Sequence, residues 1–107
     1  MNIELLFKPC RTSDLARIAC KRIYGKREIF TGDVTPWLDA AHIYDAGKTR
    51  YKHLAKLPGN IVPMTHARHI EFDKLSIGSK ISLLRTSAHD DFKAYISIVL
   101  DRLESML

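Results

Sequence analysis

The sequence has few cysteines and no long apolar run. Cys10 and Cys20 form no CxxC pair, which argues against a disulfide framework or a four-cysteine zinc site and favours reduced thiols in a cytoplasmic protein. The apolar runs stop after a few residues, far short of the roughly 20 residues that a bilayer-spanning helix needs. The N-terminus has no basic residue before its short apolar stretch, so we expect neither a secretory signal nor a membrane segment.

The length excludes large folds. A chain of 107 residues is too short for several domains or for a fold of about 200 residues such as a TIM barrel, and we expect one domain over residues 1–107. Apolar residues make up 46% of the chain, which indicates a buried core rather than disorder. Helical and extended patterns are mixed without a βαβ rhythm, so the predicted fold class is α+β. Catalysis is still open, because a metal ion and a few side chains can act on a small scaffold.

Positive charge exceeds negative charge and is unevenly distributed. Lys and Arg number 17 against 12 Asp and Glu, for a formal net charge of +5. Most of the surplus lies in residues 8–27 and 46–56. Clustered cations suit a phosphate backbone, where counterion release drives binding, although a solvated basic face without a partner has the same composition. The candidate phosphate contacts are Arg17, Lys21, Arg22, Lys48, Arg50 and Lys52.

Three segments have helical patterns. Residues 12–25 predict an amphipathic basic helix that ends at Gly25, and residues 65–75 predict a shorter helix. A last helix is expected to open at Ser87 and to cover about residues 88–106, with acidic residues in its first turn. The apolar stripes are expected at Leu15, Ile18, Ala19 and Ile23 in the first helix, and at Phe92, Ile96, Val99 and Leu103 in the last.

Four short segments have extended patterns. Residues 28–30, 37–43, 61–64 and 81–84 predict strands, the third because a proline disfavours helix at the residue before it. The polar, basic stretch 44–59 predicts a long loop, which is unusual in a small domain and indicates function or mobility. The aromatic residues expected in the core are Trp37, Phe72 and Tyr95.

Candidate chemistry is concentrated in three of these segments. His42 ends an extended segment, Asn60 follows a turn, and His69 lies in a predicted helix. Asp73 is four residues after His69, so both side chains are expected on one helix face. An imidazole and a carboxylate at that spacing form a partial shell for a divalent cation, which leaves His42 free to act as a base.

These segments resemble the HNH endonucleases, members of the His-Me finger group with a ββα-metal core. The resemblance is carried by three elements in order: Ala40, Ala41, His42 and Ile43; Asn60 and Ile61; and His69, Ile70, Glu71, Phe72 and Asp73. Thr31 and Gly32 before the first strand also fit this subgroup. The matching region is about residues 27–78, and the predicted helices before and after it are outside the family pattern.

The resemblance implies a role for each residue. His42 is the expected general base, because a neutral imidazole can accept a proton from the attacking water at pH 7. Asn60 is expected to hold the loop between the strands and to keep the His42 ring oriented. His69 and Asp73 are the expected ligands of one divalent metal ion, with Mg²⁺ as the expected ion and Mn²⁺, Ni²⁺ or Zn²⁺ as alternatives.

Two departures from the family are visible. Many relatives carry Asp or His immediately before the base, whereas this chain has Ala41, so only two protein ligands are clear. Asp39 and His66 are candidate extra ligands, and water and the DNA phosphate would complete the shell. The cysteine that many relatives carry before the Thr-Gly turn is absent, as are CxxC zinc knuckles, so the fold must depend on its hydrophobic core.

The function expected from the resemblance is metal-dependent hydrolysis of DNA phosphodiester bonds. The expected partner is DNA, and a homodimer or a second protein is a candidate source of target choice, because too little chain remains for a specificity domain. Two alternatives stay open: an inactive nucleic-acid-binding module with the same core, and a regulatory domain whose histidines bind zinc for stability.

Overall fold

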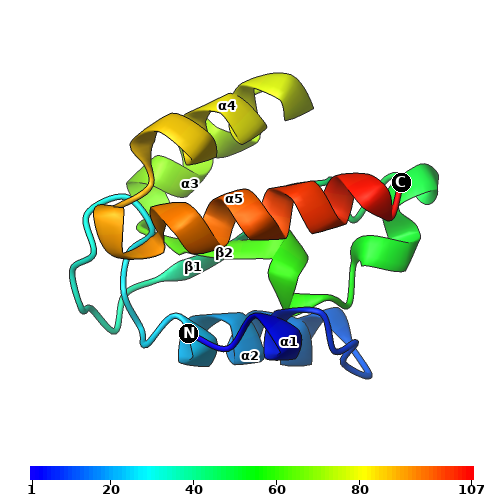
Figure 1. The fold of residues 1–107 in the computed structure, drawn as a ribbon, viewed down its shortest axis with the longest axis horizontal. Helices are drawn as coiled ribbons and strands as arrows, with labels where there is room; N and C mark the ends of the chain where they lie inside the picture. The colour runs from blue at the N-terminus through cyan, green and yellow to red at the C-terminus, as the bar shows by residue number, and fades with distance from the viewer.

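Two short antiparallel strands lie at the centre of the fold, with helices on both sides (Figure 1). The computed structural model describes residues 1–107. In chain order the elements are α1 (Ile3–Leu6), α2 (Ser13–Ile23), β1 (Asp39–His42), the 3-10 helices η1 (Thr49–Leu54) and η2 (Pro58–Asn60), β2 (Ile61–Met64), α3 (His66–Asp73), α4 (Ile77–Ser87) and α5 (Asp90–Ser105). The predicted α+β class is confirmed.

The strands pair in a register that sets which side chains face outward. Asp39 lies opposite Met64, and His42 lies opposite Ile61. All four residues of β2 are buried, whereas β1 buries only Ala41. Because side chains alternate along a strand, Ala40 and His42 share the face opposite to Ala41. β1 therefore presents the His42 side chain to a surface hollow while Ala41 faces the core.

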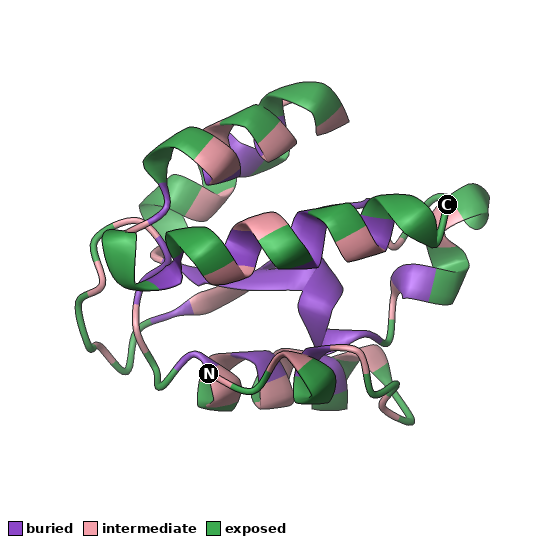
Figure 2. Ribbon diagram, viewed as in Figure 1, coloured by how far each residue is buried: buried purple, intermediate pink, exposed green.

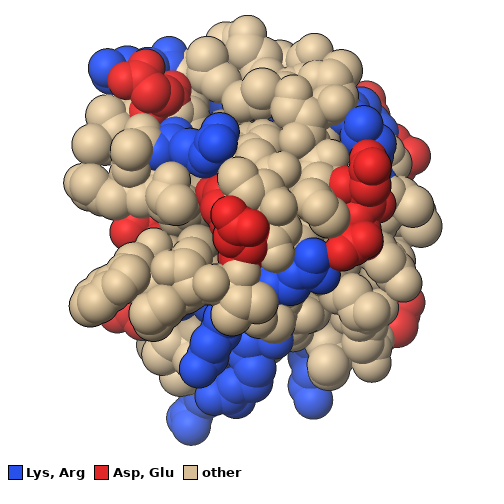
Figure 3. Space-filling model, turned by 90° about the vertical axis from the view of Figure 1, so that its left-hand side faces the viewer, with Lys and Arg blue, Asp and Glu red and all other residues tan.

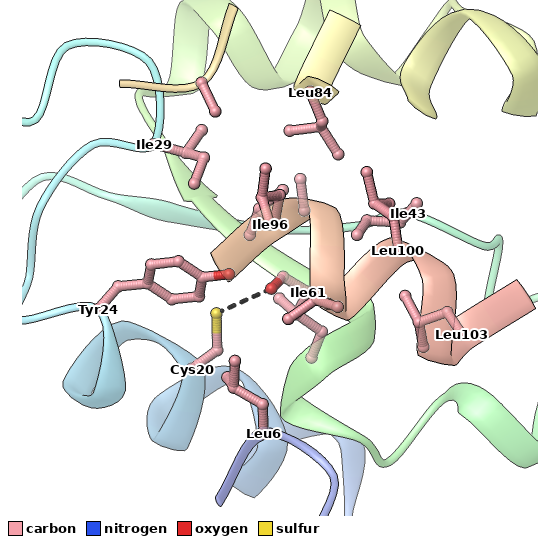
Figure 4. Close-up of a cluster of buried hydrophobic side chains, with 14 of the residues drawn as sticks. Leu6, Cys20, Tyr24, Ile29, Ile43, Ile61, Leu84, Ile96, Leu100 and Leu103 are labelled. Atoms are coloured by element: carbon pink, nitrogen blue, oxygen red, sulfur yellow. Dashed lines mark hydrogen bonds between the residues drawn. The ribbon is translucent and has the colours of Figure 1, made fainter. Parts of the chain in front are cut away.

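The core lies between β2 and the helices on its two sides. Figure 4 shows Ile61 of β2 meeting Leu6 from α1 and Ile96 and Leu100 from α5. Figure 2 shows β2 buried along its length, while each surrounding helix buries only one face. The apolar stripe predicted for the last helix is confirmed, since Phe92, Ile96, Val99 and Leu103 are all buried.

The buried face of α2 differs from the prediction. Ala16 and Cys20 are buried, whereas Leu15 and Ile18 are 47% and 50% exposed. Small side chains let α2 approach the sheet closely, and the Cys20 thiol donates a hydrogen bond to the Ile61 carbonyl oxygen at 3.1 Å. α2 is therefore rotated so that its small residues, Ala16 and Cys20, pack against β2, while the larger Leu15 and Ile18 face solvent.

The ends of α2 follow the prediction. The Thr12 hydroxyl accepts a hydrogen bond from the Leu15 amide, which is the usual N-cap interaction. Gly25 has a φ of +70°, the left-handed conformation that ends many helices. The next residue, Lys26, also has a positive φ, of 57°.

Two of the predicted strands are wrong. Residues 81–84 lie inside α4, because Ser76 caps that helix through the Ser79 amide and only one narrow face of it is buried. Residues 28–30 form a turn, since the Glu28 carboxylate accepts hydrogen bonds from the Phe30 and Thr31 amides. A short apolar run does not distinguish a strand from a helix or turn without its partners.

Smaller corrections concern Trp37 and the start of the last helix. Trp37 is 81% exposed and not a core residue, whereas Phe72 is buried as predicted and Tyr95 is half-buried. α5 begins at Asp90 with His89 as its N-cap. Ser87 is the last residue of α4 instead, because Ala88 after it has an extended backbone.

The loop 44–59 contains η1 and most of η2. Both cysteines are free, and none of the helices has the length and apolar character needed to cross a membrane.

Candidate active site

A surface hollow of about 450 Å³ brings together residues that are distant in the sequence. β1 contributes His42, α3 contributes His69 and Asp73, and the loop after β1 contributes Asp45. Arg17 from α2 and Lys80 from α4 are the two side-chain cations that complete its charged lining. The hollow thus combines one histidine from the sheet with a histidine and carboxylate pair from a helix.

The His42 ring is held by one backbone contact. Its Nε2 atom lies 3.3 Å from the Ala55 carbonyl oxygen. A carbonyl can only accept, so Nε2 carries the proton and Nδ1 keeps a free lone pair in the neutral ring. Burial lowers the pKa of His42 below its usual value near 6.5; the Ala55 contact opposes this shift and the Arg17 charge adds to it. His42 is therefore a neutral proton acceptor at pH 7.

This lowered pKa predicts the pH dependence of any reaction in which His42 is the base. Since the neutral ring is the active form, the rate should stay constant from pH 8 down to about 6.5 and fall only below that value. The measurement is a pH profile of kcat/KM, together with an NMR titration of the His42 ring. An inflection above pH 6.5 that persists in His53→Ala protein contradicts the assignment.

Asn60 clamps the chain that follows β1. It is fully buried, its Oδ1 atom accepts from the Tyr44 amide at 2.8 Å, and its Nδ2 atom donates to the Tyr44 carbonyl oxygen at 3.0 Å. The contact is with the backbone two residues after His42 and not with the His42 ring. Asn60 thus fixes the position of β1 and the loop after it, which carries Ala55 to the ring.

The residue before Asn60 must be glycine for a steric reason. A Cβ atom on Gly59 would lie 2.9 Å from the Leu6 carbonyl oxygen, which belongs to the backbone of α1. Only glycine lets α1 approach η2 so closely. The close approach holds the turn that delivers Asn60 to the core.

His69 lies between two carboxylates. Its Nδ1 atom is 2.9 Å from Asp39 Oδ2, and its Nε2 atom is 3.1 Å from Asp73 Oδ2. His66 Nδ1 contacts the same Asp39 oxygen at 2.7 Å. The hydrogen bonds from His69 and His66 lower the pKa of Asp39 below its ordinary value. Asp39 and Asp73 therefore approach opposite ring nitrogens of His69.

The contact between His69 and Asp73 joins a ring nitrogen and a carboxylate oxygen at 3.1 Å. A neutral His69 that donates its Nδ1 proton to Asp39 presents a lone pair at Nε2 to the Asp73 oxygen, so a proton or a metal ion must lie between these two atoms. An imidazole nitrogen and a carboxylate oxygen are both ligands that divalent ions accept. The donor set fits a divalent ion at this pair. No group of three or more His, Cys, Asp or Glu side chains is arranged to hold a metal ion.

The candidate extra ligands occupy other positions. Asp39 contacts the Nδ1 side of His69, away from the Nε2 atom that faces Asp73. His66 is exposed, and its Nδ1 atom contacts the same Asp39 oxygen as His69 does. Asp39 thus has the geometry of a residue that orients a metal-binding histidine from behind.

The sequence patterns did not point to Lys80, which lines the hollow, or to Glu28, which positions α3 from outside it. Glu28 is buried and also accepts from the Thr65 amide at 2.9 Å, so it ties the 28–32 turn to the start of α3. Lys80 reaches the hollow from α4, outside the region that resembles the HNH family. Glu28 is three residues before Thr31, close enough for its carboxylate to accept from the amides of that turn, whereas nothing in the local pattern distinguishes Lys80 from the other lysines.

The six predicted phosphate contacts are divided among three places. Arg17 lines the hollow beside His42, although its Nη1 atom is paired with Asp14 Oδ1 at 2.9 Å. Lys21 and Arg22 line a separate hollow together with Lys26. Lys48, Arg50 and Lys52 are exposed at η1. Figure 3 shows Lys and Arg side chains gathered at the lower edge of one face, and acidic side chains interspersed above them.

The site as a whole joins a neutral histidine with a free Nδ1 atom, a His–Asp pair whose facing atoms are both metal-ligand types, and two side-chain cations. These groups can accept a proton, hold a divalent ion and bind an anion. No protein-family model, curated protein or solved structure matches this chain.

Proposed function

We propose that the chain is a small, metal-dependent endonuclease of the HNH type that hydrolyses DNA phosphodiester bonds. The observation that carries the proposal is the meeting of His42 with the His69 and Asp73 pair in one hollow, although they come from different elements. The order of β1, β2 and α3, with α3 packed on β1, supports the same assignment.

His42 performs the proton transfer in this mechanism. Its Nδ1 lone pair takes a proton from a water molecule whose oxygen forms the new bond to phosphorus, while the bond from phosphorus to the 3′ oxygen breaks. The leaving 3′ oxygen takes its proton from solvent. Ala55 holds the His42 ring in the tautomer that this step needs, and Asn60 holds the loop that carries Ala55.

His69 and Asp73 would hold the divalent ion. Such an ion supplies positive charge that neutralises the scissile phosphate and stabilises the leaving oxygen. Asp39 keeps His69 in the tautomer with a free Nε2 atom, because it accepts the Nδ1 proton. With two protein ligands, water and the DNA phosphate complete the shell, so metal binding should be weak without DNA.

The test is conversion of supercoiled plasmid to nicked or linear DNA by the purified protein. With Mg²⁺ or Mn²⁺ we expect cleavage, and with EDTA we expect none, because the charge on the phosphate is then not neutralised. His69→Ala protein should lose cleavage as well, whereas Ala substitution of His89, which caps α5 away from the hollow, should not matter. Intact plasmid across several divalent ions and DNA forms contradicts the proposal.

A DNA-binding module without turnover is the second candidate. It is favoured by the absence of any three-ligand group and by Ala41, which is buried and offers no ligand before His42. This candidate predicts DNA binding that weakens with salt and survives His42→Ala, with no cleavage at any metal concentration. A zinc-stabilised domain instead predicts a large fall in melting temperature on chelation and little affinity for DNA.

A further inference from the structure

Lys80 is a buried cation without a partner. Its side chain lies in α4 and the residue is only 8% exposed. The Nζ atom lies over the Phe72 ring, 5.1 Å from its centroid, and forms no ion pair or hydrogen bond. Lys80 lines the hollow, and its unpaired Nζ atom keeps contact with solvent, since the Tyr24 hydroxyl is the only fully buried polar side-chain atom without a partner.

Burying an ammonium group without a counter-charge costs free energy, and lysines are almost never buried unless paired. The charged groups around the hollow do not supply the missing partner. Asp45 and Asp73 both line it, yet neither forms an ion pair with Lys80, and Asp73 is in contact with His69. An anion that enters the hollow would supply the missing partner.

We propose that Lys80 is a catalytic residue that binds a non-bridging oxygen of the phosphate group in this hollow. The substrate class rests on the proposed function, because a phosphodiester is the anion on which His42 would act. Arg17 supplies a second cation from α2 to the same hollow. Lys80 makes α4 part of the active site, which extends the site beyond the β1, β2 and α3 segment.

Negative charge develops on the phosphate oxygens in the transition state. An unpaired ammonium group beside these oxygens has its largest effect there, because it stabilises that charge. The Lys80 stem is held by Phe72 and the core, so the ammonium is positioned before the substrate arrives. Pre-organised donors of this kind stabilise charge without a reorganisation cost during the reaction.

The test compares Lys80→Met and Lys80→Arg with the wild type and with Lys93→Met, which removes a charge from the exposed face of α5. Methionine keeps the buried stem and removes the charge, so Lys80→Met should melt at the wild-type temperature or above it. Its affinity for inorganic phosphate, measured in EDTA from NMR shifts of the His42 and His69 rings, should fall at least about tenfold. Its DNA cleavage rate should fall about 10²–10³-fold, with partial recovery in Lys80→Arg.

Each outcome decides the proposal. Unchanged phosphate affinity and cleavage in Lys80→Met overturn it. A Lys80→Met protein that does not fold, or melts well below the wild type, also overturns it, because the ammonium then stabilises the fold through Phe72. Phosphate binding that depends on Lys80 in a protein that cuts no DNA supports the anion site and rejects the nuclease function, so the two failures are distinguishable.

Discussion

Replacing His42 by alanine should lower the rate of DNA cleavage by about 10²–10⁴-fold while the protein keeps its fold. The loss is large because His42 has the only ring that offers a free nitrogen from the sheet side of the hollow. The fold should survive because the ring makes a single hydrogen bond, with the Ala55 carbonyl oxygen at 3.3 Å. The measurement is the single-turnover cleavage rate with saturating metal, together with a thermal unfolding curve.

His53 provides the matched control. It also has one ring contact to a backbone carbonyl, between Nε2 and Met106 O at 3.0 Å, but it lies exposed on η1 outside the hollow. His53→Ala should cleave at the wild-type rate, and added imidazole should restore part of the activity of His42→Ala. If His42→Ala cleaves normally while His69→Ala does not, proton abstraction does not pass through His42 and the role given to His42 is wrong.

Replacing Asn60 by alanine should destabilise the whole domain by about 2–5 kcal/mol, since it leaves two buried backbone groups without partners at about 1–3 kcal/mol each. Those groups are the amide and carbonyl of Tyr44, which is itself buried. The loss is a large share of the stability of a small domain, and the melting temperature should fall by at least about 10 °C. Thermal and urea unfolding curves measure both quantities.

Asn2 offers the same substitution at an exposed position. Its Oδ1 atom accepts one hydrogen bond, from the Glu4 amide at 3.0 Å, and it caps the short helix α1. Asn2→Ala should cost only about 1 kcal/mol. Equal losses of unfolding free energy in Asn2→Ala and Asn60→Ala contradict the role given to Asn60. The effect would then come from losing an asparagine side chain in general, and not from leaving the Tyr44 amide and carbonyl without partners.

Local patterns predicted the elements whose ends or faces depend on nearby residues. The cap at Thr12, the left-handed Gly25 and the buried stripe of α5 are all present, and residues 61–64 form a strand as expected. Capping and helical periodicity act over three or four residues, so they can be read without knowing the fold.

The failures have a common cause. Leu15 and Ile18 were expected in the core and are exposed, because α2 turns its small residues to β2. Residues 81–84 predict a strand from their apolar run, yet they lie inside α4, and the sheet consists of β1 and β2 alone. Whether an apolar residue is buried depends on which surface meets it, which is a property of the assembled fold and not of the segment.

The sequence by itself determined the α+β class, the short helix that carries His69 and Asp73 on one face, and the position of His42 at the end of a strand. Spacing along one element is enough for these, because helix and strand periods are local. Only the tertiary structure decided that His42 and the His69 and Asp73 pair share a hollow, that Asn60 clamps the Tyr44 backbone, and that Lys80 reaches the site from α4. These contacts join segments far apart in the chain, and packing of the core brings them together.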